Sequence, residues 1–211
     1  MRLDRNDLRN LDKRYRATFV NSLAGVRPAV LVGTSSLAGK SNLAIFNSVI
    51  HIGADPGLWG LVFRPDTVRR DTLSNILETG HYTFNYVQSG HYREAHLTSA
   101  KFGEGVSEFE ACGFTEEWQE GFSAPYVREA VVRVGLKFET RTDIPLNGTI
   151  LIIGSICDIT TRDEWVGADG FFNHAAADVL TCAGLDAYFS PKLLGRLSYA
   201  RPGEPINDLP A

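Results

Sequence analysis

Cysteine is scarce in this sequence, which also lacks a long apolar run and an excess of basic charge. The three cysteines among its 211 residues, Cys112, Cys157 and Cys182, form no CxxC pair, so we predict reduced, mostly buried thiols and no zinc or redox site. The longest apolar run, around 150–153, is far shorter than the roughly 20 residues of a membrane span. No apolar signal segment follows the charged N-terminus. We therefore expect a cytoplasmic protein without membrane contact.

The charge balance is unlike that of a nucleic-acid-binding protein. Lys and Arg number 21 against 25 Asp and Glu, which gives a net charge of −4, and no segment is a basic run. We expect no nucleic-acid partner. Apolar residues at 44% and charged residues at 22% are ordinary for a globular protein. Because no linker or repeat divides the chain, we predict a single domain over 1–211, with a polar tail at 202–211.

Most common catalytic motifs are also absent from the sequence. It contains no GxxxxGK[ST], HExxH or GxSxG motif, and the segment from Gly103 to Glu108 lacks the third glycine of a dinucleotide-binding turn. His91 and His96 flank Glu94, but on a helix their spacing places the two imidazoles about 140° apart, so we predict no metal site. The acidic cluster Glu116, Glu117 and Glu120 is interpreted as a solvated helix face.

The hydrophobic pattern predicts short strands joined by tight turns, with a few helices between them. Strands are expected at 29–34, 42–52, 58–63, 81–87, 132–139 and 147–160, and helices at 7–23, 71–79, 92–102 and 107–112. Asp7 is the expected N-cap of the first helix, and Gly80 the left-handed residue after the second. This order favours a closed or partly closed antiparallel barrel over a parallel doubly wound sheet.

One candidate site is the start of the helix at 71–79. Arg69, Arg70 and Thr72 place cationic groups and a hydroxyl where unpaired backbone N–H groups and the helix dipole also favour an anion. Arg64 ends the preceding strand, and Asn75 lies one turn into the helix. A phosphate could bind here. The alternative, pairing of the arginines with Asp66 or Asp71 at the surface, is equally consistent with the spacing.

A second candidate site is the strand from Asn42 to Ser48, whose small and polar side chains interrupt an apolar pattern. Small residues let a flat ring approach the backbone, whose N–H and C=O groups can hydrogen-bond a heteroaromatic edge. Asn47 and Ser48 offer further donors from their side chains. The alternative is an ordinary edge strand, which the pattern by itself favours.

Many motifs in this order resemble the flavin reductase-like family, whose fold is the FMN-binding split β-barrel. The matching pieces span nearly the whole chain: Arg14-Tyr15-Arg16, Gly33-Thr34, Asn42 to Ser48, His51, Gly53, Asp55-Pro56, Arg64-Pro65, Asp71-Thr72, Asn75-Ile76, Glu78-Thr79-Gly80, Thr98 to Lys101, Ser107-Glu108-Phe109, Ala124-Pro125, Gly184-Leu185-Asp186 and Leu197 to Ala200. The resemblance implies a mainly β fold with peripheral helices (α+β), an antiparallel Greek-key split barrel on which a helix within 1–25 packs.

The resemblance also implies where FMN binds, at or near a homodimer interface. The strand matching Asn42, Leu43, Ala44, Ile45, Phe46, Asn47 and Ser48 runs beside the isoalloxazine and ribityl, while Arg64, Arg70, Thr72 and Asn75 match the segment that faces the phosphate. Ser99 and Lys101 match a stretch that approaches the flavin. His51 contacts the ring or is a core histidine, and the choice among Arg64, Arg69 and Arg70 for the phosphate stays open.

The activity implied is that of an FMN-binding oxidoreductase to which NADH or NADPH passes a hydride. Because the flavin supplies the chemistry, no catalytic side chain and no metal are predicted. One alternative is an FMN-holding electron carrier or sensor without NAD(P)H turnover, reduced by a partner protein. Another is a split-barrel module that binds a different phosphate ester.

Overall fold

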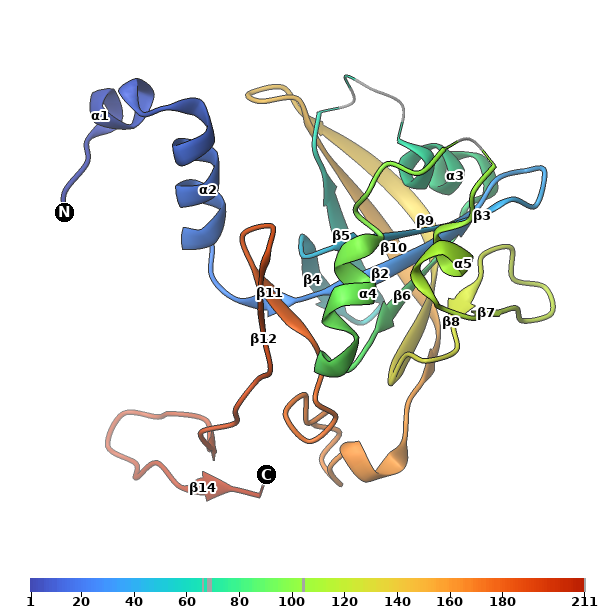
Figure 1. Cartoon of the computed structure of the whole chain (residues 1–211). Coiled ribbons are helices and arrows are strands. Elements are labelled where there is room, and N and C mark those ends of the chain that lie inside the picture. The colour runs from blue at the N-terminus through green and yellow to red at the C-terminus, as the bar shows by residue number, and fades with distance from the viewer. Residues whose placement is uncertain (66, 68–69, 104, 211) are drawn as a thin grey trace.

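The computed structural model describes residues 1–65, 67, 70–103 and 105–210, and its centre is a curled seven-stranded sheet (Figure 1). The strand order is β3-β2-β6-β9-β10-β5-β4, and every neighbouring pair is antiparallel. The strands are β2 (Val30–Ser35), β3 (Ser41–Phe46), β4 (Val49–Ala54), β5 (Gly57–Phe63), β6 (His81–Tyr86), β9 (Val132–Ile144) and β10 (Thr149–Thr160). With β3 and β4 at its two edges, this sheet confirms the predicted mainly β barrel.

The inside of the barrel follows from the alternation predicted for β9. Val132, Val134 and Leu136 point into the core, where they pack with residues such as Val32 and Phe84. A second apolar cluster lies outside the barrel, where the short helices α4 (Tyr92–Leu97) and α5 (Glu108–Cys112) cover β2 and β3. These two helices therefore lie against the strand of the second candidate site.

Helix α3 (Asp71–Thr79) confirms the predicted helix and its ending. Leu73 and Ile76 are buried in the barrel core, and Gly80 adopts the left-handed conformation, with φ of 76°. The expected helix at 92–102 is shorter than predicted, because α4 ends at Leu97 and the hydroxyl of Thr98 donates back to the Ala95 carbonyl at 2.8 Å. The predicted helix at 107–112 is present as α5.

The predicted strand at 42–52 is two strands, β3 and β4, separated by Asn47 and Ser48. The side chain of Asn47 donates to the Gly184 carbonyl at 2.6 Å, and the hydroxyl of Ser48 donates to the Val62 carbonyl at 2.7 Å. The acceptor of Asn47 lies 137 residues further along the chain, and the acceptor of Ser48 lies 14 residues further along. The break therefore depends on partners far from the strand itself.

The N-terminal segment also differs from the prediction. It forms two helices, α1 (Arg5–Asn10) and α2 (Lys13–Leu23), because Asp4 and Asp12 cap separate starts and Asp7 is not an N-cap. Neither helix buries a residue. Within the single chain, residues 1–25 do not pack on the barrel: α2 contacts β11 (Thr181–Ala183), and α1 lies beyond it (Figure 1).

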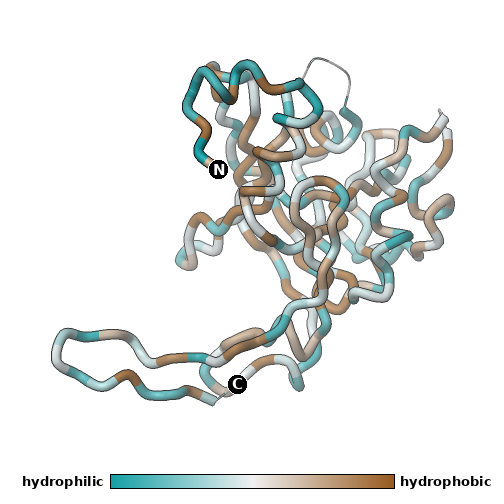
Figure 2. The backbone as a smooth tube through the Cα atoms, turned by 60° about the vertical axis from the view of Figure 1, so that its left-hand side comes forward, coloured by the Kyte–Doolittle hydropathy of each residue, from teal (hydrophilic) through white to brown (hydrophobic). Residues whose placement is uncertain are grey.

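The C-terminal third adds small sheets outside the barrel. β11 pairs with β1 (Arg27–Pro28) and with β12 (Ala187–Phe189), and the chain then runs outward to the hairpin of β13 (Arg196–Leu197) and β14 (Asp208–Leu209). Figure 2 shows this end as an open loop away from the barrel. The remaining short elements are η1 (Ser89–His91), η2 (Asp163–Trp165), β7 (Glu116–Glu117) and β8 (Tyr126–Val127).

Three smaller predictions can also be compared with the structure. Glu116 and Glu117 lie in β7 and not on a helix face. Cys112 and Cys182 are buried as predicted, whereas Cys157 is exposed, and all three are free thiols. None of the helices in the described part of the chain is long and apolar enough to cross a membrane.

Gly33, in the middle of β2, sits where a side chain cannot fit. A Cβ at this position would lie 2.2 Å from the backbone oxygen of Pro125 and 2.5 Å from Oγ1 of Thr83. We expect Gly33→Ala to lower the free energy of unfolding by about 1–3 kcal/mol, because backbone must shift to make room. Gly90→Ala is the matched control, since nothing lies within 4 Å of a Cβ there. Equal urea midpoints for the two variants would contradict this prediction.

Candidate functional site

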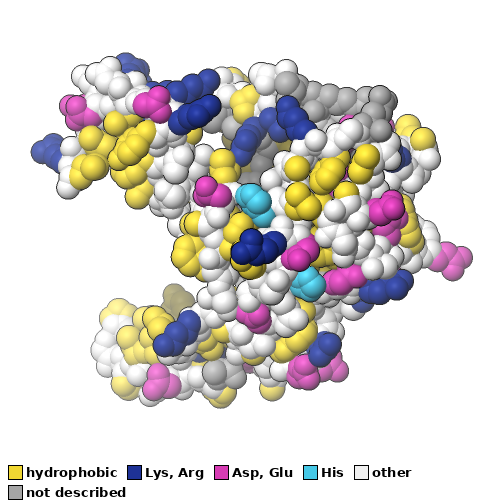
Figure 3. Space-filling view, in the orientation of Figure 1, with side chains coloured by type: hydrophobic (Ala, Val, Ile, Leu, Met, Phe, Trp, Pro, Cys, Tyr) yellow, Lys and Arg dark blue, Asp and Glu magenta, His cyan; other side chains and the backbone are white. Residues whose placement is uncertain are grey.

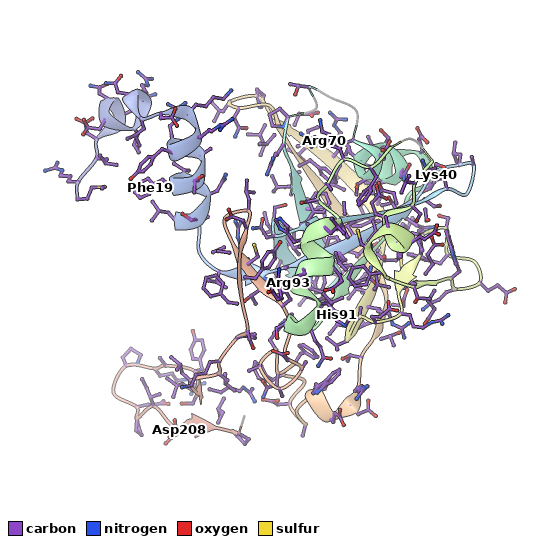
Figure 4. The ribbon with its side chains drawn as sticks, viewed as in Figure 1. Phe19, Lys40, Arg70, His91, Arg93 and Asp208 are labelled. Carbon is purple, nitrogen blue, oxygen red and sulfur yellow. The ribbon has the colours of Figure 1, made fainter. Side chains whose placement is uncertain are left out.

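The start of α3 combines an open helix end with a partly buried arginine, Arg70, whose Nε is buried. Ser74 makes the first backbone hydrogen bond of the helix, to the Arg70 carbonyl at 3.0 Å, and no side chain caps this end. The N–H groups of the first turn therefore point out of the helix. Arg70 donates to the Pro65 carbonyl at 3.4 Å, but its buried Nε has no hydrogen-bond partner among the described residues. Figure 4 labels Arg70 at this end of the barrel.

A buried Nε without a hydrogen-bond partner among the described residues, on a partly buried cation, is the feature that an anion would satisfy. Burial of a charged group without full hydrogen bonding is costly, and a phosphate oxygen can accept from both the guanidinium and helical N–H groups. Arg70 therefore fits the predicted phosphate role. Arg69 and Asp66 lie outside the described residues, so the predicted choice between arginines and the predicted pairing with Asp66 cannot be compared there.

Three predicted site residues are brought together by a buried network. The Asn42 amide donates to Oγ1 of Thr72 at 3.0 Å and to Oγ1 of Thr34 at 3.2 Å. The Asn75 amide donates to the same Thr34 oxygen at 3.1 Å. Thr34, Thr72 and Asn75 are all buried. The network ties β2, β3 and α3 together, and it fixes the open helix end beside the start of β3.

Thr34 is the residue that sequence reasoning missed as part of this site. It was matched to the family only as part of the Gly33-Thr34 pair. Its role as the common acceptor depends on partners 8 and 41 residues away. A buried threonine in a strand gives no local signal of such a role, because threonine is common in strands for packing reasons.

The edge of β3 is partly occupied by carboxylates. The Leu43 N–H donates to Oε2 of Glu108 at 3.3 Å, and the Ser41 hydroxyl donates to Glu116. Since alternate residues of an antiparallel strand direct their N–H groups to the same side, the N–H of Ile45 points to the same open edge as that of Leu43. β3 is therefore an edge strand, and the same free edge is the backbone that a flat ring could approach. The two alternatives from the sequence are compatible with each other.

The far end of β3 is closed by its own side chains. Asn47 and Ser48, predicted as donors to a ring, donate to backbone carbonyls of the protein. The amide of Asn47 also lies 3.8 Å from the sulfur of Cys182. Burial raises the pKa of the Cys182 thiol, so it is neutral at physiological pH. The thiol beside Asn47 is therefore neutral, and the charged groups that act on it are Asp186 and Arg27.

The remaining predicted residues lie around this region, and among the described residues none of them forms a hydrogen bond or an ion pair with Arg70. Ser99 and Lys101 are exposed just after α4, a helix that contacts β3. Arg64 is exposed directly after β5. His51 is exposed in β4 and is not a core histidine.

The predicted absence of a metal site can be examined in the same region. His96 shares a hydrogen bond of 2.9 Å with the hydroxyl of Tyr188, and His91 lies against the ring of Phe114. Within the described residues, no three His, Cys, Asp or Glu side chains are grouped to hold an ion.

Comparison with known proteins decides the family. The model of the flavin reductase like domain matches residues 25–177. The chain belongs to this flavin reductase-like family. A provisionally assigned flavin reductase with split barrel domain from Shewanella frigidimarina NCIMB 400 superposes with a TM-score of 0.90, at 41% identity, over 95% of this chain and 100% of that chain.

More distant structures share the same fold. Nitrilotriacetate monooxygenase component B from Bacillus cereus has a TM-score of 0.82 at 18% identity, over 93% of this chain and 98% of that chain. Flavoredoxin of Desulfovibrio vulgaris (Miyazaki F) has a TM-score of 0.68 at 22% identity, over 84% of this chain and 91% of that chain. The family and the split-barrel fold implied by the resemblance are thus confirmed.

Loss of the Arg70 guanidinium should weaken FMN binding. We expect Arg70→Gln to raise the Kd for FMN roughly 10- to 150-fold, because a charge-assisted hydrogen bond contributes about 1.5–3 kcal/mol. Fluorescence titration of FMN with the purified variant measures this. Arg201→Gln is the control, since that side chain is 64% exposed and pairs with Glu204 in the C-terminal segment. An unchanged Kd for Arg70→Gln would exclude Arg70 from the phosphate site.

Proposed function

We propose that the protein is a cytoplasmic, homodimeric FMN-binding oxidoreductase that passes a hydride from NADH or NADPH to the flavin. The observation that carries the proposal is the buried Nε of Arg70 at the start of α3, where the described residues provide neither a partner for Nε nor a side-chain cap for the helix. This end is fixed beside β3 by the contact of Asn42 with Thr72. A phosphate at α3 therefore leaves the rest of an FMN molecule next to the open edge of β3.

In this proposal the residues of the chain bind and orient, and the flavin supplies the redox chemistry. Arg70 and the first-turn N–H groups of α3 hold the phosphate. The N–H of Ile45 lies on the β3 edge that a ring would approach, next to the N–H of Leu43, which Glu108 already occupies. Small residues such as Ala44 leave the backbone accessible to a flat ring. No general base is required.

We assign Ser99, Lys101 and Arg64 to the rim of the same site. Ser99 and Lys101 follow α4, which contacts β3, and their exposed side chains can move toward a bound molecule. Arg64 follows β5 and precedes Pro65, whose carbonyl accepts from Arg70. A lysine and an arginine near a phosphate would add to its electrostatic attraction.

Two projecting segments support the homodimer. We call residues 1–26 the N-terminal arm and residues 190–210 the C-terminal arm; Phe19 and Asp208 mark them in Figure 4. Figure 3 shows a gap between the arms, with hydrophobic side chains on both sides of it. Large exposed apolar residues on the arms are Tyr15, Val20, Leu23, Val26, Leu194, Leu197, Tyr199, Ile206 and Leu209. Short helices and two-residue strands need packing partners to be stable, and a second copy would cover both arms.

The arms are also structurally connected to the proposed flavin strand. Asn47, just after β3, holds the Gly184 carbonyl, and a Cβ on Gly184 would lie 3.6 Å from Cβ of Ser22 in α2. A second copy seated against the arms would therefore lie next to the end of the flavin strand.

Replacement of apolar residues on the C-terminal arm should weaken the dimer. We expect the wild-type protein to have twice the chain mass of 23.2 kDa in light scattering, and the Leu197→Ser/Tyr199→Ser variant to shift toward a single chain because apolar burial is lost. Leu146→Ser is the control, since Leu146 is 97% exposed in the turn between β9 and β10. A wild-type protein with the mass of one chain would exclude the homodimer.

The oxidoreductase activity is tested by visible absorption of the FMN-loaded protein under anaerobic conditions. We expect the flavin band to bleach on addition of NADH or of NADPH, each added to a separate sample. A flavin that stays yellow until dithionite is added would favour the alternative of an electron carrier or sensor. A protein that takes up no FMN would overturn the assignment and favour a different phosphate ester.

A further inference from the structure

A hollow of about 370 Å³ lies at the other end of the barrel from α3. It is bounded by the turn between β8 and β9, by the end of β10 and by η2. Its volume is within the range of small-molecule sites. Among the residues that line it are Arg128, Glu129, Arg133, Arg162 and Trp165.

This hollow is separate from the proposed flavin site. Arg70 contacts Pro65, and a Cβ on Gly148, in the turn between β9 and β10, would lie 3.4 Å from Pro65. The hollow lies at the opposite end of the same hairpin. Along β9, which has 13 residues, roughly 40 Å of strand separates the hollow from the Pro65 end of the hairpin. The hollow is nearer to β3, because Ile45 lies in register with Arg133 across β2 and β6, and three strand spacings amount to roughly 14 Å.

Two arginines at the hollow keep most of their donors available. The side chain of Arg128 is 63% exposed, and its Nε lies 3.9 Å from Glu117, beyond hydrogen-bond distance. The side chain of Arg162 is 72% exposed, pairs with Glu164 at 3.4 Å and lies over the ring of Trp165. Exposed pairs of this kind contribute little, so both guanidinium groups can turn to an oxyanion, which they bind through two parallel N–H groups.

Two of the three carboxylates near these arginines accept from other donors. Glu117 is held by Arg133, whose side chain is only 18% exposed. Glu129 accepts the Thr115 N–H at 3.0 Å. Glu164 is 63% exposed at the rim and free to turn into water. The charge of Glu117 is therefore balanced by Arg133, and an incoming anion would compete with Glu164 for Arg162.

An aromatic surface lies next to the two arginines. Trp165 is partly buried against the barrel core, and the Arg162 guanidinium lies 5.1 Å from the centre of its ring. The core holds the indole in place, and a planar ring can stack on its face when Arg162 turns from the ring to an anion. The hollow thus combines a surface for a planar ring with two cations that suit a phosphate.

We propose that this hollow binds a nucleoside monophosphate, with the phosphate between Arg128 and Arg162 and the base on Trp165. The bound nucleotide is not the electron donor, because the three strand spacings between Ile45 and Arg133, roughly 14 Å, exceed the contact distance that hydride transfer needs. The site is therefore a second nucleotide site and does not depend on the proposed reductase activity.

Calorimetric titration of the full-length protein with 5′-AMP tests this proposal. We expect AMP to bind, and Arg128→Gln and Arg162→Gln each to weaken it at least tenfold through loss of a charge-assisted contact. Trp165→Leu should weaken AMP and adenosine but not inorganic phosphate. Arg201→Gln, outside the hollow, should leave the affinity for AMP unchanged.

Further titrations distinguish this site from the flavin site. Arg70→Gln should leave AMP binding unchanged, whereas loss of AMP binding in that variant would place AMP at α3 and overturn the proposal. Wild-type affinity in the Arg128→Gln/Arg162→Gln double variant would overturn it too. So would the absence of AMP binding at millimolar concentration, or inorganic phosphate binding as tightly as AMP.

Discussion

The buried hydroxyl of Thr34 is the contact on which the proposed cofactor site depends. It accepts hydrogen bonds from the amides of Asn42 and Asn75, and so joins β2, which carries Thr34, to the edge strand β3 and to α3. Polar groups buried in this way are costly unless each finds its partner. The three elements can therefore take only those positions in which both amides reach one oxygen, and this constraint places the open end of α3 beside β3.

The two ends of β3 are held by different partners. Near Asn42, β3 is held to α3 and its edge is met by the carboxylates of Glu108 and Glu116. Beyond Phe46, Asn47 turns to Gly184 and ends the strand. The part of the edge between them is short, and it is the part that a ring could approach. The register of any bound ring would therefore be set by contacts outside β3.

The sequence predicted best those elements whose causes are local. The alternation of β9 and the left-handed Gly80 after α3 depend on neighbouring residues, so periodicity and turn chemistry were sufficient. The break at Asn47 and the role of Thr34 depend on partners 137 and 41 residues away. No local pattern indicates such partners. Arg70 lies between these cases, because the helix start was predictable but the burial of Nε was not.

The N-terminal arm shows a further reason why sequence reasoning fails at particular places. Tyr15 and Phe19 recur at helical spacing, and this pattern predicts an apolar face that needs cover. It does not say which molecule covers it. The spacing of the apolar residues along the helix is the same whether their face packs on the barrel of the same chain or on another chain. In the single chain, α2 buries none of its residues. An amphipathic pattern therefore predicts that a helix has a packing partner, while only the fold shows whether that partner belongs to the same chain.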